Sequence, residues 1–376
     1  MRVDELSLTD FRSYPRLEVA FGPGPHVVVG ANAAGKTNLL EAMVVLSRGG
    51  SHRARTDQEL IRWGAPAGRV EALVSREVAT SSADRLEVAL AAPGPGVRAQ
   101  KRIRVNGVGR RADALADALR TVLFAPESMA LVSGSPSLRR DELDLVVAQL
   151  RPGHAHALAT YGRALSQRNS LLRLIRDGSA DRDQLTYWDR VLVEEGGTIV
   201  EGRLAVIEAL APALAAAHLE IAPGELPLLV SYETNAPAQP GETPADALRR
   251  RLRETAEKEA WNGQTLVGPH RDDIRFTLGG RDAASYGSRG QQRSIILALK
   301  LAELDLLARR DGVAPLLLLD DVFSELDPDR RAHLVRRIGA LPQAFITTTA
   351  LEDLDPALVA ESTAWRVAPG RLERIP

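Results

Sequence analysis

The stretch Gly30-Ala-Asn-Ala-Ala-Gly-Lys-Thr37 is a full match to the phosphate-binding pattern G-x-x-x-x-G-K-[ST]. It follows a short apolar run, His26–Val29, and precedes Lys36–Leu46, where apolar residues recur at helical spacing. This order predicts a buried strand, a glycine-rich turn and a helix, whose backbone N–H groups and positive dipole end together bind anions. The stretch therefore predicts an α/β nucleotide-binding fold. A chance match in this Gly- and Ala-rich chain is the weaker alternative.

The residues of this loop have predicted roles in holding a nucleoside triphosphate. Gly30 and Gly35 allow the backbone to approach the phosphates, which a Cβ atom would obstruct. Lys36 is expected to reach the β- and γ-phosphates, and the Thr37 hydroxyl is expected to bind Mg²⁺. The predicted nucleotide-binding residues are Gly30, Asn32, Gly35, Lys36, Thr37 and Asn38.

A second signal is an apolar run that ends in two carboxylates, Leu316–Leu319 followed by Asp320 and Asp321. A continuous apolar run is typical of a parallel strand buried on both faces, and ligands bind at the carboxyl ends of such strands. We predict that Asp320 binds Mg²⁺, directly or through water. Asp321 is predicted to orient the attacking water and, with Lys36, to form the catalytic pair. A solvated strand end is the alternative.

A third signal lies about 250 residues after the phosphate-binding loop. The run Ser288-Arg-Gly-Gln291 precedes an amphipathic helix over Arg293–Ala308 and offers a hydroxyl, free N–H donors and a positive dipole end. An ATPase that closes one nucleotide between two protomers needs such a turn, whereas an ordinary helix N-cap is the alternative. The predicted in-trans residues are Ser288, Gly290 and Gln291, with Ser324 and Asp327 in the turn after the aspartate pair.

The composition is that of a globular chain. Of 376 residues, 44% are hydrophobic and 26% are charged, and the net charge of −1 excludes a basic field over the whole molecule. The absence of cysteine excludes disulfides and thiolate metal sites. The acidic N-terminus has no apolar signal-peptide region, and we expect no stretch with the apolar length of a membrane span. We therefore expect a cytoplasmic protein that makes no membrane contact.

The order of patterns predicts an α/β body interrupted by helices. Apolar and alternating runs predict strands at Val3–Phe11, Leu17–Phe21, His26–Val29, Arg69–Arg76, Leu86–Ala91, Arg102–Val105, Leu228–Tyr232, near Leu266 and at Ile274–Leu278. The dipeptide Asn106-Gly107 predicts a hairpin turn. We place residues 1–135 and 262–376 in one ATPase lobe, and residues 136–261 in a mainly helical second lobe.

The helical segment runs from Leu138 to about Ile221 and is rich in Ala, Leu, Arg and Glu. Breaks are expected at Pro152-Gly153, at residues 177–179 and at Pro212. The segment is predicted to be a hairpin of two long helices that folds back at residues 177–181. A charged helix over Ala245–Trp261 is expected to follow it.

These motifs resemble the ATP-binding cassette head shared by ABC transporters and SMC proteins, and in finer detail the RecF family of recombination-mediator ATPases. The runs that carry the resemblance are Gly30–Glu41, Ser51-His52-Arg53 with Asp57, Phe124–Glu127, Gly134-Ser135-Pro136, Tyr161, Gln167-Arg168-Asn169, Gly268–Asp273, Gly290–Arg293 and Leu319–Val322. The resemblance implies an ABC-type head with a mixed sheet and helices (lobe I), and a mainly helical lobe II with a short helical arm.

The resemblance also implies a function. It implies an ATPase that uses ATP and Mg²⁺, forms a homodimer on ATP binding, and binds gapped DNA or single-strand/duplex junctions. It implies partnership with the RecO and RecR proteins in loading the RecA recombinase. Most cassette ATPases carry Glu where this chain has Asp321, and the shorter side chain predicts slow hydrolysis. The resemblance implies a weak, DNA-dependent ATPase. Thr348 or Thr349 stands where a switch histidine is usual, and is predicted to contact the γ-phosphate.

Local arginine clusters are the candidates for contacts with DNA phosphates. The predicted contacts are Arg53, Arg55, Arg139, Arg140 and Arg168. An ion pair or a solvated helix face is the alternative for each of them. His270, in the Gly268–Asp273 run, is interpreted as a structural residue.

Three other functions compete with this interpretation. A transporter ATPase subunit has a much shorter spacing between its two nucleotide signals. An SMC-type tether needs long heptad repeats, which this short arm, broken by Pro and Gly, does not have. A non-enzymatic DNA clamp is disfavoured by Lys36, Thr37, Asp320 and Ser288, which it would not need.

Overall fold

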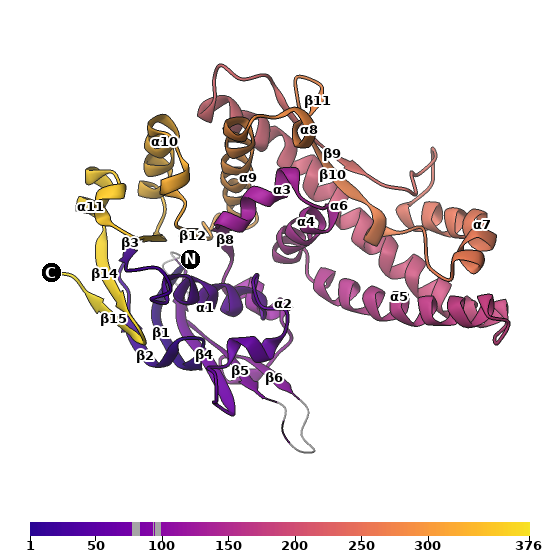
Figure 1. The fold of residues 1–376 in the computed structure, drawn as a ribbon, viewed down its shortest axis with the longest axis horizontal. Coiled ribbons are helices and arrows are strands. Elements are labelled where there is room, and N and C mark those ends of the chain that lie inside the picture. The colour runs from indigo at the N-terminus through magenta and orange to yellow at the C-terminus, as the bar shows by residue number, and fades with distance from the viewer. Residues whose placement is uncertain (77–82, 93, 95–98) are drawn as a thin grey trace. The chain divides into compact units, whose positions relative to one another are not determined.

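The computed structural model describes residues 1–76, 83–92, 94 and 99–376. These residues form two compact units, shown in Figure 1. Unit 1 comprises Met1–Met129, Ala217–Gly224 and Arg293–Pro376, and unit 2 comprises Ala130–Ala216 and Glu225–Gln292. The observed α/β architecture, with mixed sheets and a helical part, confirms the predicted fold class.

A six-stranded sheet forms one layer of unit 1. Its order is β15 (Arg371–Arg374), β14 (Thr363–Ala368), β3 (Gly24–Val29), β13 (Gln343–Thr348), β12 (Leu316–Asp320) and β8 (Thr121–Phe124). All pairs are parallel except β14 with β15. Every residue of β12 is buried, as its continuous apolar run predicts. Because β3 and β12 are parallel to β13, the phosphate-binding loop and Asp320 lie at the same edge of the sheet.

A second, antiparallel sheet forms the other layer of unit 1. Its order is β2 (Tyr14–Ala20), β1 (Arg2–Phe11), β4 (Ala67–Ser75), β5 (Asp84–Ala91), β6 (Gln100–Val105) and β7 (Val108–Gly109). The helix after the loop, α1 (Lys36–Arg48), packs against strands of both sheets and is buried along almost its whole length. The predicted hairpin turn is confirmed, since Asn106 and Gly107 have φ values of 54° and 78° and join β6 to β7.

Short helices complete unit 1. They are η1 (Asp57–Leu60), α2 (Asp113–Ala118), η2 (Pro126–Met129), η5 (Phe323–Glu325), α10 (Pro328–Gly339), η6 (Leu351–Asp353) and α11 (Pro356–Glu361). The longer helix α9 (Arg289–Arg309) begins in unit 2 and continues into unit 1. Its residues from Ser294 to Glu303 are continuously buried, although the sequence predicted an amphipathic helix.

Unit 2 is mainly helical. Its elements are α3 (Ala130–Ser133), α4 (Pro136–Leu150), α5 (His154–Arg176), η3 (Arg182–Leu185), most of α6 (Thr186–Ile221), β9 (Leu228–Glu233), α7 (Pro244–Asn262), η4 (Pro269–Arg271), β10 (Asp273–Leu278), β11 (Arg281–Asp282) and α8 (Ala283–Tyr286). The predicted fold-back near residues 177–181 is confirmed between α5 and η3, and α4 is a separate helix. Figure 1 shows α7 beside α5, and the two helices are in contact.

Two local predictions were wrong. The helix α6 continues through Pro212. Pro212 frees the carbonyl of Glu208, and both residues lie on the exposed face, where water can bind that carbonyl. No strand forms at Leu266, because side chains take its backbone groups. The Leu266 N–H donates to the Glu259 carboxylate at 2.7 Å, and its carbonyl accepts from the Asn235 amide at 3.0 Å.

The division between units differs from the predicted lobes at its second boundary. The first predicted boundary, after residue 135, lies near the observed division after Met129. The second was placed after residue 261, yet unit 2 extends to Gln292. Antiparallel pairing of β10 with β9, from Asp273↔Glu233 to Leu278↔Leu228, holds this segment in unit 2. The run Ser288–Gln291 therefore belongs to unit 2.

The helical stretch Arg182–Ile221 is apolar and long enough to cross a membrane by length and composition, contrary to the expectation from the sequence. Of its most apolar window, 44% is buried in the structure. Arg203, within this helix, is buried and pairs with Asp144 at 2.7 Å. Gly196 and Gly202 lie against side chains of α7, α5 and α4. These contacts identify α6 as a core helix of unit 2.

Gly197 of α6 allows α7 to pack closely against α6, and its replacement should lower the stability of the protein. A Cβ atom at Gly197 would lie 2.7 Å from the Cβ and 3.0 Å from the Cα of Ala245. We expect Gly197→Ala to destabilise the protein by about 1–3 kcal/mol, despite the better helix propensity of Ala. The measurement is the midpoint of urea unfolding.

Gly162 provides the matched control for this prediction. It lies inside α5, and a Cβ atom added there would have no other atom within 4 Å. We expect Gly162→Ala to be neutral or to stabilise the protein by about 0.5–1 kcal/mol. Equal midpoints for the two variants would show that α6 and α7 do not depend on this close approach.

Candidate nucleotide-binding site

The phosphate-binding loop has no room for side chains at its two glycines. Gly35 has φ 116°, and a Cβ atom there would lie 2.8 Å from the Ser13 hydroxyl. At Gly30 a Cβ atom would lie 2.8 Å from the carbonyl oxygen of Val367. Both contacts are closer than real Cβ atoms approach, so both glycines are needed for packing, and Gly35 is needed for its backbone conformation as well.

Lys36, the first residue of α1, is buried, and its ammonium group turns back over the loop. The Nζ atom donates to the carbonyl oxygens of Gly30 at 2.6 Å and Ala31 at 3.2 Å. Phosphate oxygens would be stronger acceptors for this charge than neutral carbonyls are. The geometry therefore keeps the ammonium at the predicted phosphate site.

A hydrogen-bond network joins the loop to the two aspartates. The Thr37 hydroxyl donates to Asp320 Oδ1 at 3.1 Å, and the Thr347 hydroxyl donates to the same oxygen at 2.7 Å. Thr347 also accepts the backbone N–H of Asp321 at 2.9 Å. Asp321 has a left-handed backbone, with φ 54°. The structure thus brings together Thr37, Asp320 and Asp321, and adds Thr347 from the end of β13.

Thr37 and Asp320 fit the donor set of a magnesium site. Mg²⁺ prefers oxygen ligands and usually keeps several waters, so that one or two protein oxygens and phosphate oxygens complete its shell. A hydroxyl and a carboxylate 3.1 Å apart beside Lys36 match that requirement. If Mg²⁺ is bound there, it supplies charge neutralisation of the phosphates.

A pocket of about 280 Å³ surrounds these groups within unit 1. It is lined by Ala31, Asn32, Ala33, Gly35, Lys36, Thr37, Asn38, Arg53, Pro126, Glu127, Asp320 and Asp321. Arg53, predicted as a DNA contact, instead lines this pocket, because the turn after α1 returns to the loop. Pro126 and Glu127 belong to a run noted for its resemblance but not assigned to the site. They follow β8, a strand parallel to β12 that the sequence patterns did not predict, so no sequence signal placed them at the site.

The turn that carries Arg53 is fixed from α1. The Ser51 hydroxyl accepts the backbone N–H groups of Arg53 at 2.9 Å and Ala54 at 3.0 Å, and donates to the Glu41 carboxylate. Arg12 also binds Glu41 through two hydrogen bonds of 2.8 and 2.7 Å. Burial alone would raise the pKa of Glu41, but the hydrogen bonds from Arg12 and Ser51 outweigh it and lower that pKa. Glu41 is therefore a charged anchor between α1 and the pocket wall.

The β1–β2 turn supports the loop from another side. The Asn38 amide donates to the Ser13 hydroxyl at 2.9 Å, and the Tyr14 hydroxyl donates to the Gly35 carbonyl at 3.1 Å. Arg12 has φ 50°, a conformation that L-residues rarely adopt outside turns. Asn38 thus lines the pocket while its amide holds the turn. Asn32 is exposed at the pocket's rim.

The predicted in-trans run forms a helix N-cap in unit 2. The Ser288 hydroxyl accepts the Gln291 N–H at 3.2 Å, and the Gln291 side chain accepts the Ser288 N–H at 2.9 Å, which is a capping box. Ser288 is exposed and Gly290 follows within the first turn of α9. A capping role accounts for Ser288 and Gln291 within one chain, so their contact with a second copy stays a prediction.

The turn after the aspartates is ordered by its own side chains. The Ser324 hydroxyl donates to the Asp321 carbonyl at 2.9 Å. Asp327 caps α10 by accepting the Arg330 N–H at 3.0 Å, and it forms an ion pair with the Arg330 side chain. These contacts place Ser324 next to Asp321, whereas Asp327 begins the following helix.

The hydroxyls proposed for the switch position point elsewhere. Thr348 is buried, and its hydroxyl donates to the Ala350 carbonyl at 2.8 Å. The Thr349 hydroxyl donates to Asp353 at 3.4 Å on the surface. Neither lines the pocket. The threonine that reaches the metal aspartate is Thr347, one residue earlier.

Two of the predicted DNA contacts are occupied within unit 2. The Arg168 side chain is 2% exposed and lies between Asp189 at 2.6 Å and Glu259 at 2.7 Å. Arg139 binds Asp273 through two hydrogen bonds of 2.7 and 2.9 Å. We therefore withdraw Arg168 and Arg139 as DNA contacts, since their donors already have buried or half-buried acidic partners.

The other candidate DNA contacts have different surroundings. Arg140 donates to the Asp272 carbonyl at 2.7 Å and is half-buried. Arg55 lies next to η1, and it is exposed, so solvent and ligands can reach it. His270, interpreted from the sequence as structural, lies 2.7 Å from the Tyr161 hydroxyl and 3.4 Å from the Thr265 carbonyl.

Comparison with known proteins agrees with this geometry. The family model described as the RecF/RecN/SMC N-terminal domain matches residues 2–361. The chain is 38% identical to the DNA replication and repair protein RecF of Heliobacterium modesticaldum, covering 100% of this chain and 99% of the relative. It is 37% identical to RecF of Bacillus subtilis, covering 99% and 100%.

Solved structures give the same grouping. Two structures of the recombination mediator protein RecF in the RecFOR pathway, RecF-ATPrS and RecF-ATP, have TM-scores of 0.89 and 0.88 with this chain. Both are 30% identical to it, and the matches cover 100% of this chain and 98% and 97% of those chains. An Smc head bound to a ScpA domain shares the fold at a TM-score of 0.54 and 15% identity, covering 100% of this chain and 98% of that one.

The Thr347 hydroxyl should be needed for nucleotide chemistry. Thr347→Val keeps the shape of the side chain but removes the bonds to Asp320 and to the Asp321 N–H. We expect a loss of about 10–100-fold in Mg²⁺-dependent ATP affinity or hydrolysis, the usual effect of removing a group that orients a metal ligand. Thr348→Val, whose hydroxyl contacts Ala350, should have little effect. A larger effect of Thr348→Val would restore its predicted switch role.

His270 should make the stability depend on pH. Burial lowers its pKa from 6.5 to about 4, and nearby arginines contribute in the same direction. The folded protein therefore keeps His270 neutral where the unfolded chain binds a proton, so stability is full above pH 6.5 and falls as pH drops from 6.5 toward 4.

Replacement by Gln isolates this contribution. We expect urea midpoints of His270→Gln protein to fall less steeply than those of the unaltered protein across that range. His26, His52 and His333, whose pKa values burial also lowers, remain in the variant and contribute to the residual slope. Equal slopes for the two proteins would show that His270 is not buried in its neutral form.

Proposed function

The chain belongs to the RecF family of DNA replication and repair proteins, and on that premise we propose that it is an ATP-dependent, DNA-binding recombination mediator. The observation that carries the proposal is the contact of Thr37 with Asp320, 3.1 Å apart, beside the Lys36 ammonium. This arrangement supports nucleoside triphosphate and Mg²⁺ binding. Solved RecF structures with ATP support ATP as the nucleotide.

We assign the residues of the site as follows. Lys36 holds the β- and γ-phosphates, while Thr37 and Asp320 hold Mg²⁺. Asp321 orients the attacking water and accepts its proton, because its carboxylate lies at the pocket wall. Arg53, which lines the same pocket, adds positive charge toward the phosphates.

The remaining predicted residues act between two copies of the chain. Ser288, Gly290 and Gln291 of one protomer contact the γ-phosphate held by the other, with Ser324 and Asp327 at the same interface. ATP favours the dimer because these contacts exist only in the dimer, so nucleotide binding and association are linked. Hydrolysis removes the γ-phosphate and releases the protomers. We propose that this step is slow, since Asp321 is one methylene shorter than glutamate.

The dimer binds DNA and acts in recombinational repair in the cytoplasm. We propose gapped DNA and single-strand/duplex junctions as its substrates, with RecR and RecO as partners in loading RecA. A dimer presents two copies of each weak DNA-contact surface, such as the one around Arg55, and both copies can bind one DNA molecule. Because ATP favours the dimer, the affinity for DNA depends on ATP, and because the contacts are with phosphates, it also falls with salt. DNA in turn stimulates the weak ATPase activity.

Sedimentation with a labelled gapped duplex tests the proposal. We expect ATP with Mg²⁺ to drive the unaltered protein into a DNA-bound dimer. Ser288→Arg protein should bind ATP yet stay monomeric, whereas Ser285→Arg, the same change at an exposed position just before the run, should dimerise. Asp321→Asn protein should dimerise and fail to release.

Two outcomes would contradict this proposal. Dimerisation without nucleotide would show that ATP does not control association. A monomeric Asp321→Asn protein that binds ATP would show that the dimer does not form before hydrolysis. In either case the run at Ser288 is a helix cap alone, and an SMC-like clamp without a loading role explains the fold better.

A further inference from the structure

Unit 2 contains a groove that the nucleotide site does not use. It has a volume of about 410 Å³ and lies between α5, the η3–α6 segment and α7. We call it the arm groove. Its lining residues are Arg168, Leu172, Arg182, Leu185, Thr186, Asp189, Arg190, Val193, Glu194, Arg249, Leu252, Arg253, Ala256 and Ala260.

The floor of the arm groove is apolar. Leu172, Leu185, Val193 and Leu252 are buried and come from all three sides of the groove. On α7 the lining residues recur every three or four positions from Arg249 to Ala260, so one stripe of that helix faces the groove. The eleven helical steps from Arg249 to Ala260, at a rise of about 1.5 Å each, give the groove a length of about 16 Å. This length suits a short peptide segment.

The rim of the arm groove is rich in charged side chains. Five arginines line it against two acidic residues, Asp189 and Glu194. Arg168 lies at the base and is neutralised by Asp189 and Glu259. Arg182 has its own acidic partner, Glu257, at 2.8 Å. Once Glu257, Glu259 and Asp246 (the partner of Arg249) are counted, the acids equal the arginines in number, so what distinguishes the open side is the arginines that have no acidic partner among the described residues.

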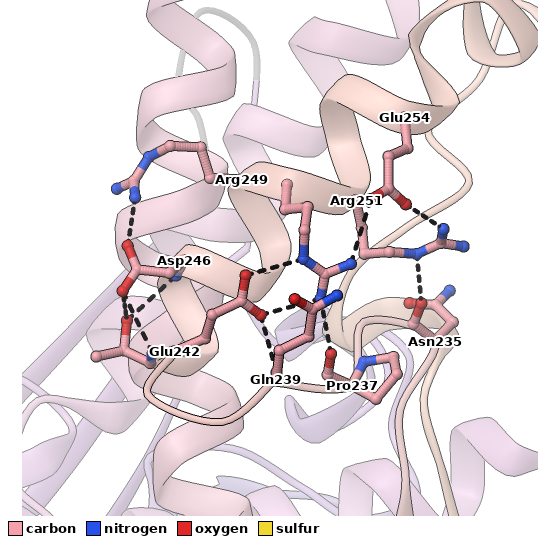
Figure 2. A network of polar contacts seen from close by, with 10 residues as sticks. Asn235, Pro237, Gln239, Glu242, Asp246, Arg249, Arg251 and Glu254 are labelled. Atoms are coloured by element: carbon pink, nitrogen blue, oxygen red, sulfur yellow. Dashed lines mark hydrogen bonds and ion pairs between the residues drawn. The ribbon is translucent and has the colours of Figure 1, made fainter.

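The arginines of α7 differ in whether they are already paired. Figure 2 shows the start of this helix, where Arg249 binds Asp246 at 2.5 Å and Arg251 binds Glu254 at 2.6 Å. Arg250 binds Glu242 at 2.9 Å. By contrast, no carboxylate among the described residues pairs with Arg253, the exposed arginine on the groove side.

Arg190 is the second unpaired cation, on the α6 side. It is exposed, and its guanidinium lies over the ring of Tyr187 with 5.6 Å to the centroid. Stacking on an aromatic ring holds the guanidinium plane while leaving its N–H donors available. No acidic partner is found for it within residues 99–376. Arg190 and Arg253 thus present two free, bidentate donors on opposite sides of an apolar floor.

We propose that the arm groove binds an acidic segment of a partner protein, with an apolar side chain on the floor and carboxylates on Arg190 and Arg253. Carboxylates match the fork of guanidinium donors, and an apolar anchor uses the buried floor. A DNA backbone fits less well, because phosphodiesters bring no apolar group for the floor of the groove. The groove lies in unit 2 alone and goes beyond the ATP-dependent function.

Fluorescence anisotropy of labelled peptide pools tests the proposal on the full chain without nucleotide. One pool contains octapeptides of Asp, Glu, Leu and Phe in random order, and the other replaces the acids by Lys and Arg. We expect the acidic pool to bind, more weakly at higher salt. The double variant R190E/R253E should bind it at least about tenfold more weakly, because close charge pairs at interfaces are worth about 1.5 kcal/mol or more.

Two further variants separate the groove from general charge effects. Lys258→Glu reverses one charge, as each half of the double variant does, at an exposed position of α7 outside the groove, and should bind within about twofold of the unaltered protein. Ala256→Glu places a carboxylate at an exposed position inside the groove and should weaken binding. Unfolding midpoints confirm that each variant is folded.

Several outcomes would overturn the proposal. It fails if the acidic pool binds no better than the basic pool, or if R190E/R253E and K258E have equal effects. It also fails if R190E/R253E loses affinity for gapped DNA while neither protein binds the peptides, since the groove is then a nucleic-acid surface. Because no ATP is present, failure here leaves the nucleotide-dependent dimer untouched, and failure of that dimer leaves the groove untouched.

Discussion

The contact between Thr37 and Asp320 is the interaction on which the nucleotide site depends. Their oxygens lie 3.1 Å apart, although 283 positions separate the two residues in the chain. β13 lies between β3 and β12, aligns their ends, and contributes the Thr347 hydroxyl to the same carboxylate. A shift of β13 by one residue would turn Thr347 to the other face of the sheet. The order of the strands is therefore as important for the geometry of the nucleotide site as the phosphate-binding loop is.

Sequence patterns predicted β1 to β6, α1 and β12 of unit 1 because each pattern reflects a local constraint, whereas β8, β14 and β15 were not predicted. The apolar run before Asp320 and the glycine spacing at residues 30–35 allow few other structures. Tertiary contacts explain what was missed. Leu266 makes no strand because Glu259 and Asn235 bind its backbone, and Thr347 looked like any other threonine until β13 was placed beside β12.

Arginine shows the limit of sequence interpretation most clearly. Arg53, Arg139 and Arg168 were predicted together as DNA contacts, yet one lines the nucleotide pocket and two lie in ion pairs. Pairing depends on which helix lies opposite, and composition does not contain that information. The same principle separates Arg251 from Arg253, two residues apart on α7. Their difference becomes visible only when the acids around each side chain are known.

The backbone at Asp321 has a consequence for how the ATPase could change over time. With φ 54°, this position lies in the left-handed region, where aspartate and asparagine are tolerated better than other residues with a Cβ atom. A glutamate would lengthen the carboxylate but bring a side chain less suited to that conformation. The residue that we propose limits the rate of hydrolysis is thus also the one that the local backbone favours. A variant with faster hydrolysis would need a different backbone conformation at position 321 before a glutamate there could increase the rate.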